Sequence, residues 1–72
     1  MKKTFKMQDL DCANCAAKME RAINKLDGVE KATVSFMTQN LTIEAEDSCF
    51  NDIMDQVVLI CRKVEPDCRI LR

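Results

Sequence analysis

The apolar residues of this 72-residue chain change their spacing several times, and that succession limits the possible folds more than any other feature. Where apolar and polar side chains alternate, the pattern predicts a strand with one buried face. Where apolar side chains recur at intervals of three and four, it predicts an amphipathic helix. Strands are therefore expected at residues 4–8, 29–36, 41–45 and 68–71, and helices at residues 13–26 and 50–64.

The resulting order is β-α-β-β-α-β, and each predicted helix has a single apolar face. Both helices can therefore cover one face of an antiparallel sheet. This order predicts an α+β fold, the ferredoxin-like βαββαβ sandwich, with a four-stranded antiparallel sheet and two helices on one face. The chain has the length of one small domain, so we expect residues 1–72 to form a single domain.

Local signals predict where the helices begin and end. Gly28, the only glycine, suits the left-handed residue just past the first helix. Ser48 is expected to cap the start of the second helix, and Pro66 to end it, because the residue before a proline avoids helical geometry. Polar residues of the first helix, among them Glu20 and Asn24, are expected to form a solvated face.

Composition argues against several classes of function. The net charge is −1 and the only aromatic residues are three phenylalanines, so we expect no nucleic-acid binding. The longest apolar run, Val57 to Cys61, is far too short to span a bilayer, and no apolar stretch follows the basic start, so neither membrane insertion nor a secretory signal is expected. The five cysteines include three in or beside periodic segments, which favours a reducing, cytoplasmic compartment over a disulfide framework.

The most specific motif is Cys12-x-x-Cys15, which lies between the first predicted strand and the first predicted helix. Two residues between the cysteines allow both sulfur atoms to reach one point, where a zinc ion would lie at about 2.3 Å from each. The positive end of the helix dipole should lower the thiol pKa and favour thiolates. The spacing serves both metal binding and redox chemistry, so it leaves a metal site and a dithiol–disulfide oxidoreductase open.

Taken over nearly its whole length, the chain resembles the heavy-metal-associated (HMA) domains of heavy-metal P-type ATPases and of small metallochaperones. The resemblance rests on Cys12-x-x-Cys15, on Leu26-x-Gly28-Val29 and on the order of the elements. It implies that Cys12 and Cys15 bind a metal ion. The absence of tryptophan before the pair and the element order count against a thioredoxin-like oxidoreductase.

The residues before the first cysteine differ from the Gly-Met-Thr of copper-binding relatives, because Asp9, Leu10 and Asp11 stand there instead. An aspartate directly before the first cysteine resembles the branch that exports zinc, cadmium and lead. Electrostatics points the same way, since two thiolates neutralise a divalent ion and leave room for a carboxylate. With Cu⁺ the two thiolates already leave a negative charge, and a carboxylate oxygen matches that soft ion poorly.

A tetrahedral ion needs ligands beyond two thiolates, and the chain has no histidine. Asp11 is the leading candidate because it adjoins Cys12, and the alternative for Asp11 is a solvated or helix-capping carboxylate. Glu65 is the second, because the loop before the last strand lies beside the cysteine loop in this fold; its alternative is a solvated helix end. Asp9 and Asp67 are weaker candidates. Cys49, Cys61 and Cys68 are read as small apolar residues, although Cys61 and Cys68 flank the final loop.

The sequence thus predicts a module that binds one Zn²⁺, Cd²⁺ or Pb²⁺ ion through Cys12, Cys15, Asp11 and Glu65. The resemblance implies a cytosolic domain of a metal-exporting P-type ATPase, which would be a monomer whose partners are the transmembrane or other cytosolic domains of the same ATPase. No catalysis is expected from these residues alone. A free-standing metallochaperone, including one for copper, and a small dithiol–disulfide oxidoreductase are the alternatives.

Overall fold

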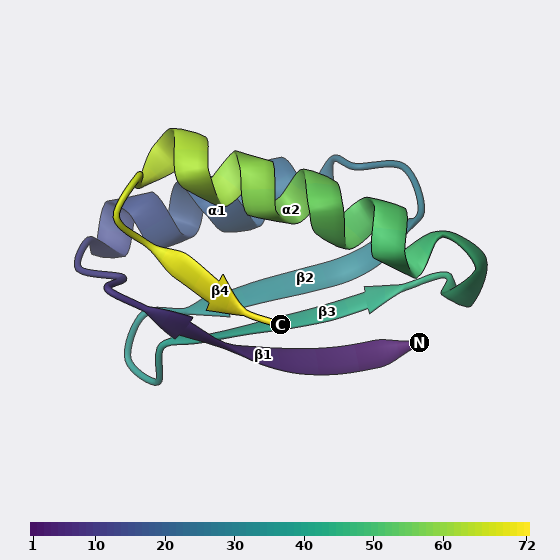
Figure 1. The fold of residues 1–72 in the computed structure, drawn as a ribbon, viewed down its shortest axis with the longest axis horizontal. Coiled ribbons are helices and arrows are strands. Elements are labelled where there is room, and N and C mark those ends of the chain that lie inside the picture. The colour runs from purple at the N-terminus through teal and green to yellow at the C-terminus, as the bar shows by residue number, and fades with distance from the viewer.

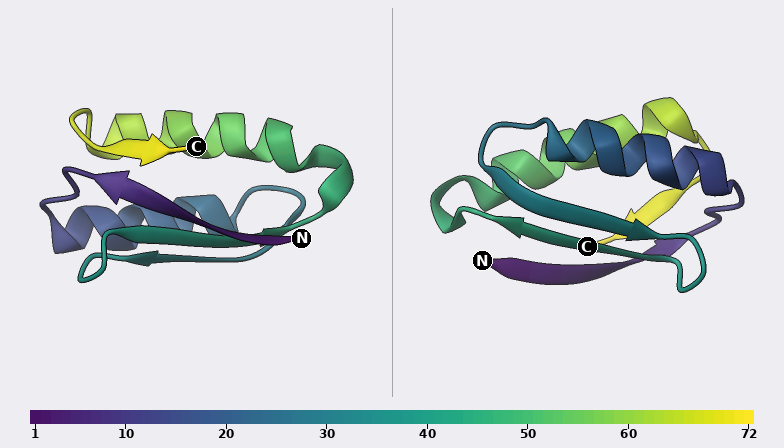
Figure 2. Two further views of the ribbon diagram at one scale, coloured as in Figure 1. Left: turned by 60° about the horizontal axis from the view of Figure 1, so that its bottom comes forward. Right: turned by 180° about the vertical axis from the view of Figure 1, so that it is seen from behind.

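The computed structural model describes all residues, 1–72, and has the predicted layers: a four-stranded antiparallel sheet with both helices on one face (Figures 1 and 2). The ferredoxin-like βαββαβ order predicted from apolar spacing is therefore confirmed. One short 3₁₀ turn at residues 47–49 precedes the second helix. The elements are β1 (Lys2–Gln8), α1 (Ala13–Asn24), β2 (Val29–Ser35), β3 (Asn40–Ala45), α2 (Phe50–Val64) and β4 (Arg69–Leu71).

The strands lie in the order β2-β3-β1-β4, so β1 is central and pairs with two partners. The first part of β1 pairs with β3, and its last residues pair with β4, where Met7 lies opposite Ile70 and Gln8 opposite Arg69. The pairing is antiparallel, so the chain that leaves β1 and the chain that enters β4 lie at the same end of the sheet (Figure 1). This places the cysteine loop beside the loop between α2 and β4.

The core between the sheet and the helices contains only apolar side chains and cysteines, with no buried polar residue. Leu10, in the loop after β1, is 1% exposed and closes the core at that end. Burial of this apolar surface supplies the main driving force for the fold. No helix has the combination of length and apolar character that crossing a membrane requires. The most deeply buried side chains are Met7, Leu10, Met19, Ile23, Leu41, Ile43, Met54, Val57 and Cys61.

The helix boundaries differ in part from the sequence predictions. Helix α1 ends at Asn24, earlier than the apolar spacing suggested, and the chain turns through Gly28, whose φ of +89° is the predicted left-handed conformation. The prediction for Ser48 was wrong, because Ser48 lies inside the 3₁₀ turn and Cys49 precedes α2 without a side-chain cap. A short run of tighter helix there replaces a capping side chain.

The polar face of α1 is not simply solvated, which corrects the prediction for Glu20 and Asn24. The side chain of Asn24 accepts a hydrogen bond from the Ala32 N–H at 2.8 Å and donates one to the Ala32 carbonyl at 2.9 Å. A Glu20 carboxylate oxygen accepts from the Val34 N–H at 2.8 Å. Since β2 is an edge strand, these bonds occupy backbone groups that would otherwise be free to pair with another chain.

Candidate metal centre

The cysteine motif lies where the sequence predicted it, between the end of β1 and the start of α1. Cys12 is the N-cap of α1: its backbone is extended, with φ −129° and ψ 115°, and its sulfur accepts a hydrogen bond from the Cys15 N–H at 3.2 Å. A sulfur thus takes the place of the oxygen that usually caps a helix. Because helix N-termini carry partial positive charge, this position favours the thiolate of Cys12.

The two thiols of the motif differ in acidity. Interaction with the Cys15 thiol, followed by the Cys15 backbone N–H, holds the pKa of Cys12 below its ordinary value. The pKa of Cys15 is raised to about 11, first by the neighbouring Cys12 sulfur and then by desolvation and by the Glu65 carboxylate. The helix N-terminus was expected to lower thiol pKa values, and only Cys12 follows that expectation. Cys12 therefore ionises first, and the second thiolate forms at much higher pH.

Glu65 lies next to this pair because of the β1–β4 pairing. It is the C-cap of α2 and is half-buried; its N–H donates to the Cys61 carbonyl at 2.9 Å, and its own carbonyl accepts from the Cys68 N–H at 3.0 Å. Its carboxylate raises the pKa of Cys15 and acts in the same direction on the pKa of Cys12. Glu65 is thus the carboxylate whose charge acts on both thiols of the pair.

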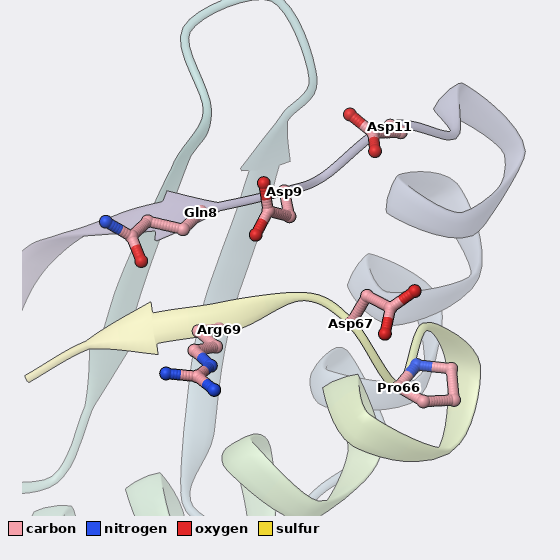
Figure 3. Close-up of a pocket in the computed structure, with 6 residues that line it drawn as sticks. All are labelled: Gln8, Asp9, Asp11, Pro66, Asp67 and Arg69. Atoms are coloured by element: carbon pink, nitrogen blue, oxygen red, sulfur yellow. The ribbon is translucent and has the colours of Figure 1, made fainter.

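Asp11 has a different setting, in a polar groove of about 440 Å³ on the side where β1 meets β4 (Figure 3). Burial raises the pKa of the Cys68 thiol, and the charges of Glu65, Asp9 and Asp11 add to that shift. The carboxylate that acts on the pKa of Cys12 and Cys15 is Glu65. The structure therefore brings Glu65 to the cysteine pair and Asp11 to the groove. The groove is lined by Gln8, Asp9, Asp11, Pro66, Asp67 and Arg69.

The side chains that could bind a metal ion at the candidate site do not enclose a position for it. No three cysteine, aspartate or glutamate side chains converge closely enough to hold an ion between them. All five cysteines are free, but Cys61 and Cys68 are buried, and burial raises the pKa of Cys61 to about 12. Cys49 packs near Gly28, in the region where α1 connects to β2. A third protein ligand could therefore join Cys12 and Cys15 only after its side chain moved.

One residue beside the cysteine loop was missed by sequence reasoning. Residues 37–40 separate two predicted strands and show no functional motif, yet the side-chain amide of Gln39 forms hydrogen bonds with both backbone groups of Leu10. A glutamine in a polar turn has no spacing or motif that distinguishes it. The contact depends on where the turn lies in three dimensions, so no signal in the sequence could have found it.

Comparison with known proteins matches residues 4–59 to the heavy-metal-associated domain. The chain is 41% identical over 54 residues to the zinc/cadmium/lead-transporting P-type ATPase of Escherichia coli, which is 75% of this chain and 7% of that protein. It is 32% identical to the solution structure of the apo N-terminal domain of ZntA, with a TM-score of 0.73 and coverage of 99% and 92% of the two chains. A copper-exporting P-type ATPase of Bacillus subtilis is 37% identical over 43 residues, 60% of this chain and 5% of that protein. The match thus spans only a small part of the transporters.

The unequal thiol pKa values predict an order of modification. At mildly alkaline pH, iodoacetamide should label Cys12 first, because the thiolate is the reacting species and Cys12 has the lowered pKa. Cys12→Ser should bring the pKa of Cys15 down from about 11 toward its ordinary value, since the Cys12 sulfur is the largest cause of the shift. Mass spectrometry of timed samples measures the order. Labelling of Cys15 ahead of Cys12 would contradict this assignment.

Proposed function

The chain belongs to the heavy-metal-associated domain family, and we propose that it binds one Zn²⁺, Cd²⁺ or Pb²⁺ ion through Cys12 and Cys15. The observation that carries this proposal is the position of Cys12 as the cap of α1, with its sulfur at the helix N-terminus and the Cys15 thiol beside it. Metal binding requires deprotonated thiols, and an ion between the two sulfur atoms would supply the charge that stabilises the second thiolate.

The charges around the pair support a divalent ion. Two thiolates and the Glu65 carboxylate together carry three negative charges, which leaves one net negative charge on a complex with a 2+ ion. The same three ligands around Cu⁺ would leave two net negative charges on the complex. The carboxylates of Asp9 and Asp11 on the same loop would repel that charge. Zinc also accepts carboxylate oxygen, at about 2.0–2.2 Å, whereas Cu⁺ prefers soft sulfur ligands. The name of the E. coli relative includes the same three divalent metals.

For the third ligand we favour Glu65 over Asp11, although Asp11 is the neighbour of Cys12 in the sequence. Glu65 is half-buried beside both thiols and influences the pKa of each, while Asp11 lines the groove with Asp9 and Asp67. The backbone of Glu65 is held by its hydrogen bonds to Cys61 and Cys68 and by the following Pro66, so we propose that rotation of its side chain brings the carboxylate to the ion. The remaining position would hold water or an incoming ligand.

In its cellular setting, we infer that this domain serves the cytosolic side of a metal-exporting P-type ATPase. An open two-cysteine loop suits capture and release of an ion, because a closed cage would slow its transfer. The domain would act as a single monomeric unit over residues 1–72 and would exchange the ion with the other domains of the transporter. It would carry out no transport or hydrolysis by itself.

Replacing Cys12 and Cys15 together with serine should abolish binding of one equivalent of Cd²⁺ to the reduced protein, measured by the thiolate-to-metal charge-transfer absorption. The variant should remain folded, because the buried core contains neither residue. Dispersed amide spectra without metal would show that the fold does not depend on the ion, unlike zinc fingers. Cys49→Ser, which changes a cysteine elsewhere, is the matched control and should bind normally.

Unchanged Cd²⁺ binding by the double variant would refute the role of the pair. The alternative, a dithiol oxidoreductase, makes a different prediction: turnover in an insulin-reduction assay by a reversible Cys12–Cys15 disulfide. Such turnover together with no metal binding by the wild-type protein would replace the proposed function with that one.

The ligand role of Glu65 predicts a clear difference between two charge-removing variants. Glu65→Gln should weaken Zn²⁺ and Cd²⁺ binding by at least the roughly 10- to 100-fold that loss of a residue supporting a ligand costs, because here the ligand itself is changed. Asp11→Asn, the matched control, should change the affinity by much less. Competition titration with a chelator measures both. A larger effect of Asp11→Asn would make Asp11 the ligand, and a loss of affinity only in Cys61→Ser or Cys68→Ser would mean that the third ligand is sulfur.

A further inference from the structure

We propose that Gln39 is the positioning residue of the metal loop: its side-chain amide holds the backbone of Leu10, two residues before Cys12, and thereby sets where the first thiol lies. This inference rests on the proposed function, in which Cys12 and Cys15 bind the ion. It adds a residue that lies far from both cysteines in the sequence and touches neither sulfur. Gln39 comes from the turn between β2 and β3, which lies at the same end of the sheet as the cysteine loop (Figures 1 and 2).

The contact uses all three strong hydrogen-bonding groups of a primary amide. The Gln39 Oε1 accepts a hydrogen bond from the Leu10 N–H at 3.0 Å, and the Gln39 Nε2 donates to the Leu10 carbonyl at 2.6 Å. The second Nε2 hydrogen is donated to the Phe36 carbonyl at 2.9 Å, which ties the amide to its own turn. Both the oxygen and the nitrogen of the amide therefore form hydrogen bonds, and these bonds define the orientation of the amide.

Leu10 depends on this side chain because nothing else pairs with its backbone. It lies outside β1 and α1, and it makes no backbone–backbone hydrogen bond. The Leu10 side chain is 1% exposed, so its backbone groups sit at the edge of the core. A backbone N–H or carbonyl left there without a partner costs free energy comparable to a lost hydrogen bond. The Gln39 amide thus provides hydrogen-bond partners for the N–H and the carbonyl of Leu10, the loop residue whose side chain anchors the cysteine loop to the core.

The backbone on both sides of the contact has an unusual conformation. Asp9 and Gln39 are the only residues other than glycine with positive φ, at 60° and 56°. Such values are uncommon for residues with a side chain, and they persist where the surrounding structure holds them. The Gln39 carbonyl also accepts a hydrogen bond from the Met7 N–H at 2.8 Å. Gln39 therefore forms hydrogen bonds with the chain both before and after Asp9, at Met7 and at Leu10. Together these bonds fix the path from β1 to Cys12.

The fixed path matters for binding because the site has few ligands and an open side. With Leu10 anchored, only Asp11 separates the fixed backbone from Cys12, so the cap of α1 and the Cys12 sulfur keep their place before an ion arrives. Without the anchor, ordering this segment would count against the binding free energy. Gln39 should therefore affect metal affinity more than its distance from the ion would suggest.

The test uses Gln39→Asn and Gln39→Gly, because asparagine and glycine both tolerate positive φ and neither can reach Leu10. The matched control is Gln56→Asn, the same change at an exposed position of α2. With Cd²⁺ alone as the probe, we expect both Gln39 variants to raise the Kd by about tenfold, and Gln56→Asn to leave it unchanged. In the metal-free protein, hydrogen exchange of the Leu10 amide should become faster in the Gln39 variants only, a local change that a general loss of stability would not produce.

Three outcomes are distinguishable. If the wild type binds Cd²⁺ and both Gln39 variants bind more weakly while remaining folded, the positioning role is supported. If the wild type and the Gln39 variants bind equally, this role is overturned and the Cys12–Cys15 site stands. If the wild type fails to bind Cd²⁺, the proposed function itself is overturned, and the positioning role falls with it.

Discussion

The antiparallel pairing of β1 with β4 is the constraint on which the arrangement at the candidate metal centre depends. Gln8 lies opposite Arg69, so the chain that leaves β1 and the chain that enters β4 meet at one end of the sheet. The pairing brings Glu65, at the end of α2, to a cysteine pair that is 50 residues away along the chain. The β2–β3 turn reaches the same end, and its Gln39 side chain holds Leu10. The cysteine loop thus lies beside two other parts of the fold.

The two thiols of the candidate site differ in acidity, and this difference bears on the proposed metal binding. Cys12 caps α1 and has a lowered pKa, while the pKa of Cys15 is raised to about 11 by its neighbours. If both cysteines bind an ion as thiolates, binding would therefore release a proton from Cys15. That coupling makes affinity increase with pH through the range in which Cys15 remains protonated. It also means that a local drop in pH favours release of the ion.

Much of the fold could be predicted from the sequence, because apolar spacing reports directly which face of an element is buried. The position of Cys12 and Cys15 followed from the same pattern, since both lie at the junction of a predicted strand and a predicted helix. Features set by tertiary contacts could not be predicted. Glu20 and Asn24 were assigned to solvent because helical spacing does not show that their side chains reach the edge of β2.

The choice between Asp11 and Glu65 as the third ligand also depends on tertiary contacts that the sequence does not show. Adjacency in the sequence favoured Asp11, whereas the β1–β4 pairing brings Glu65 to the thiols and leaves Asp11 in the groove. Gln39 lacked any local signal, because its side chain pairs with Leu10 backbone groups that have no backbone partner and lie on another loop. X-ray absorption of the Zn²⁺-loaded protein can show which atoms surround the ion. Binding through Cys12, Cys15 and Glu65 should give two sulfur atoms at about 2.3 Å and oxygen at about 2.0–2.2 Å. A shell without sulfur, or with three or more sulfur atoms, would exclude this set of ligands.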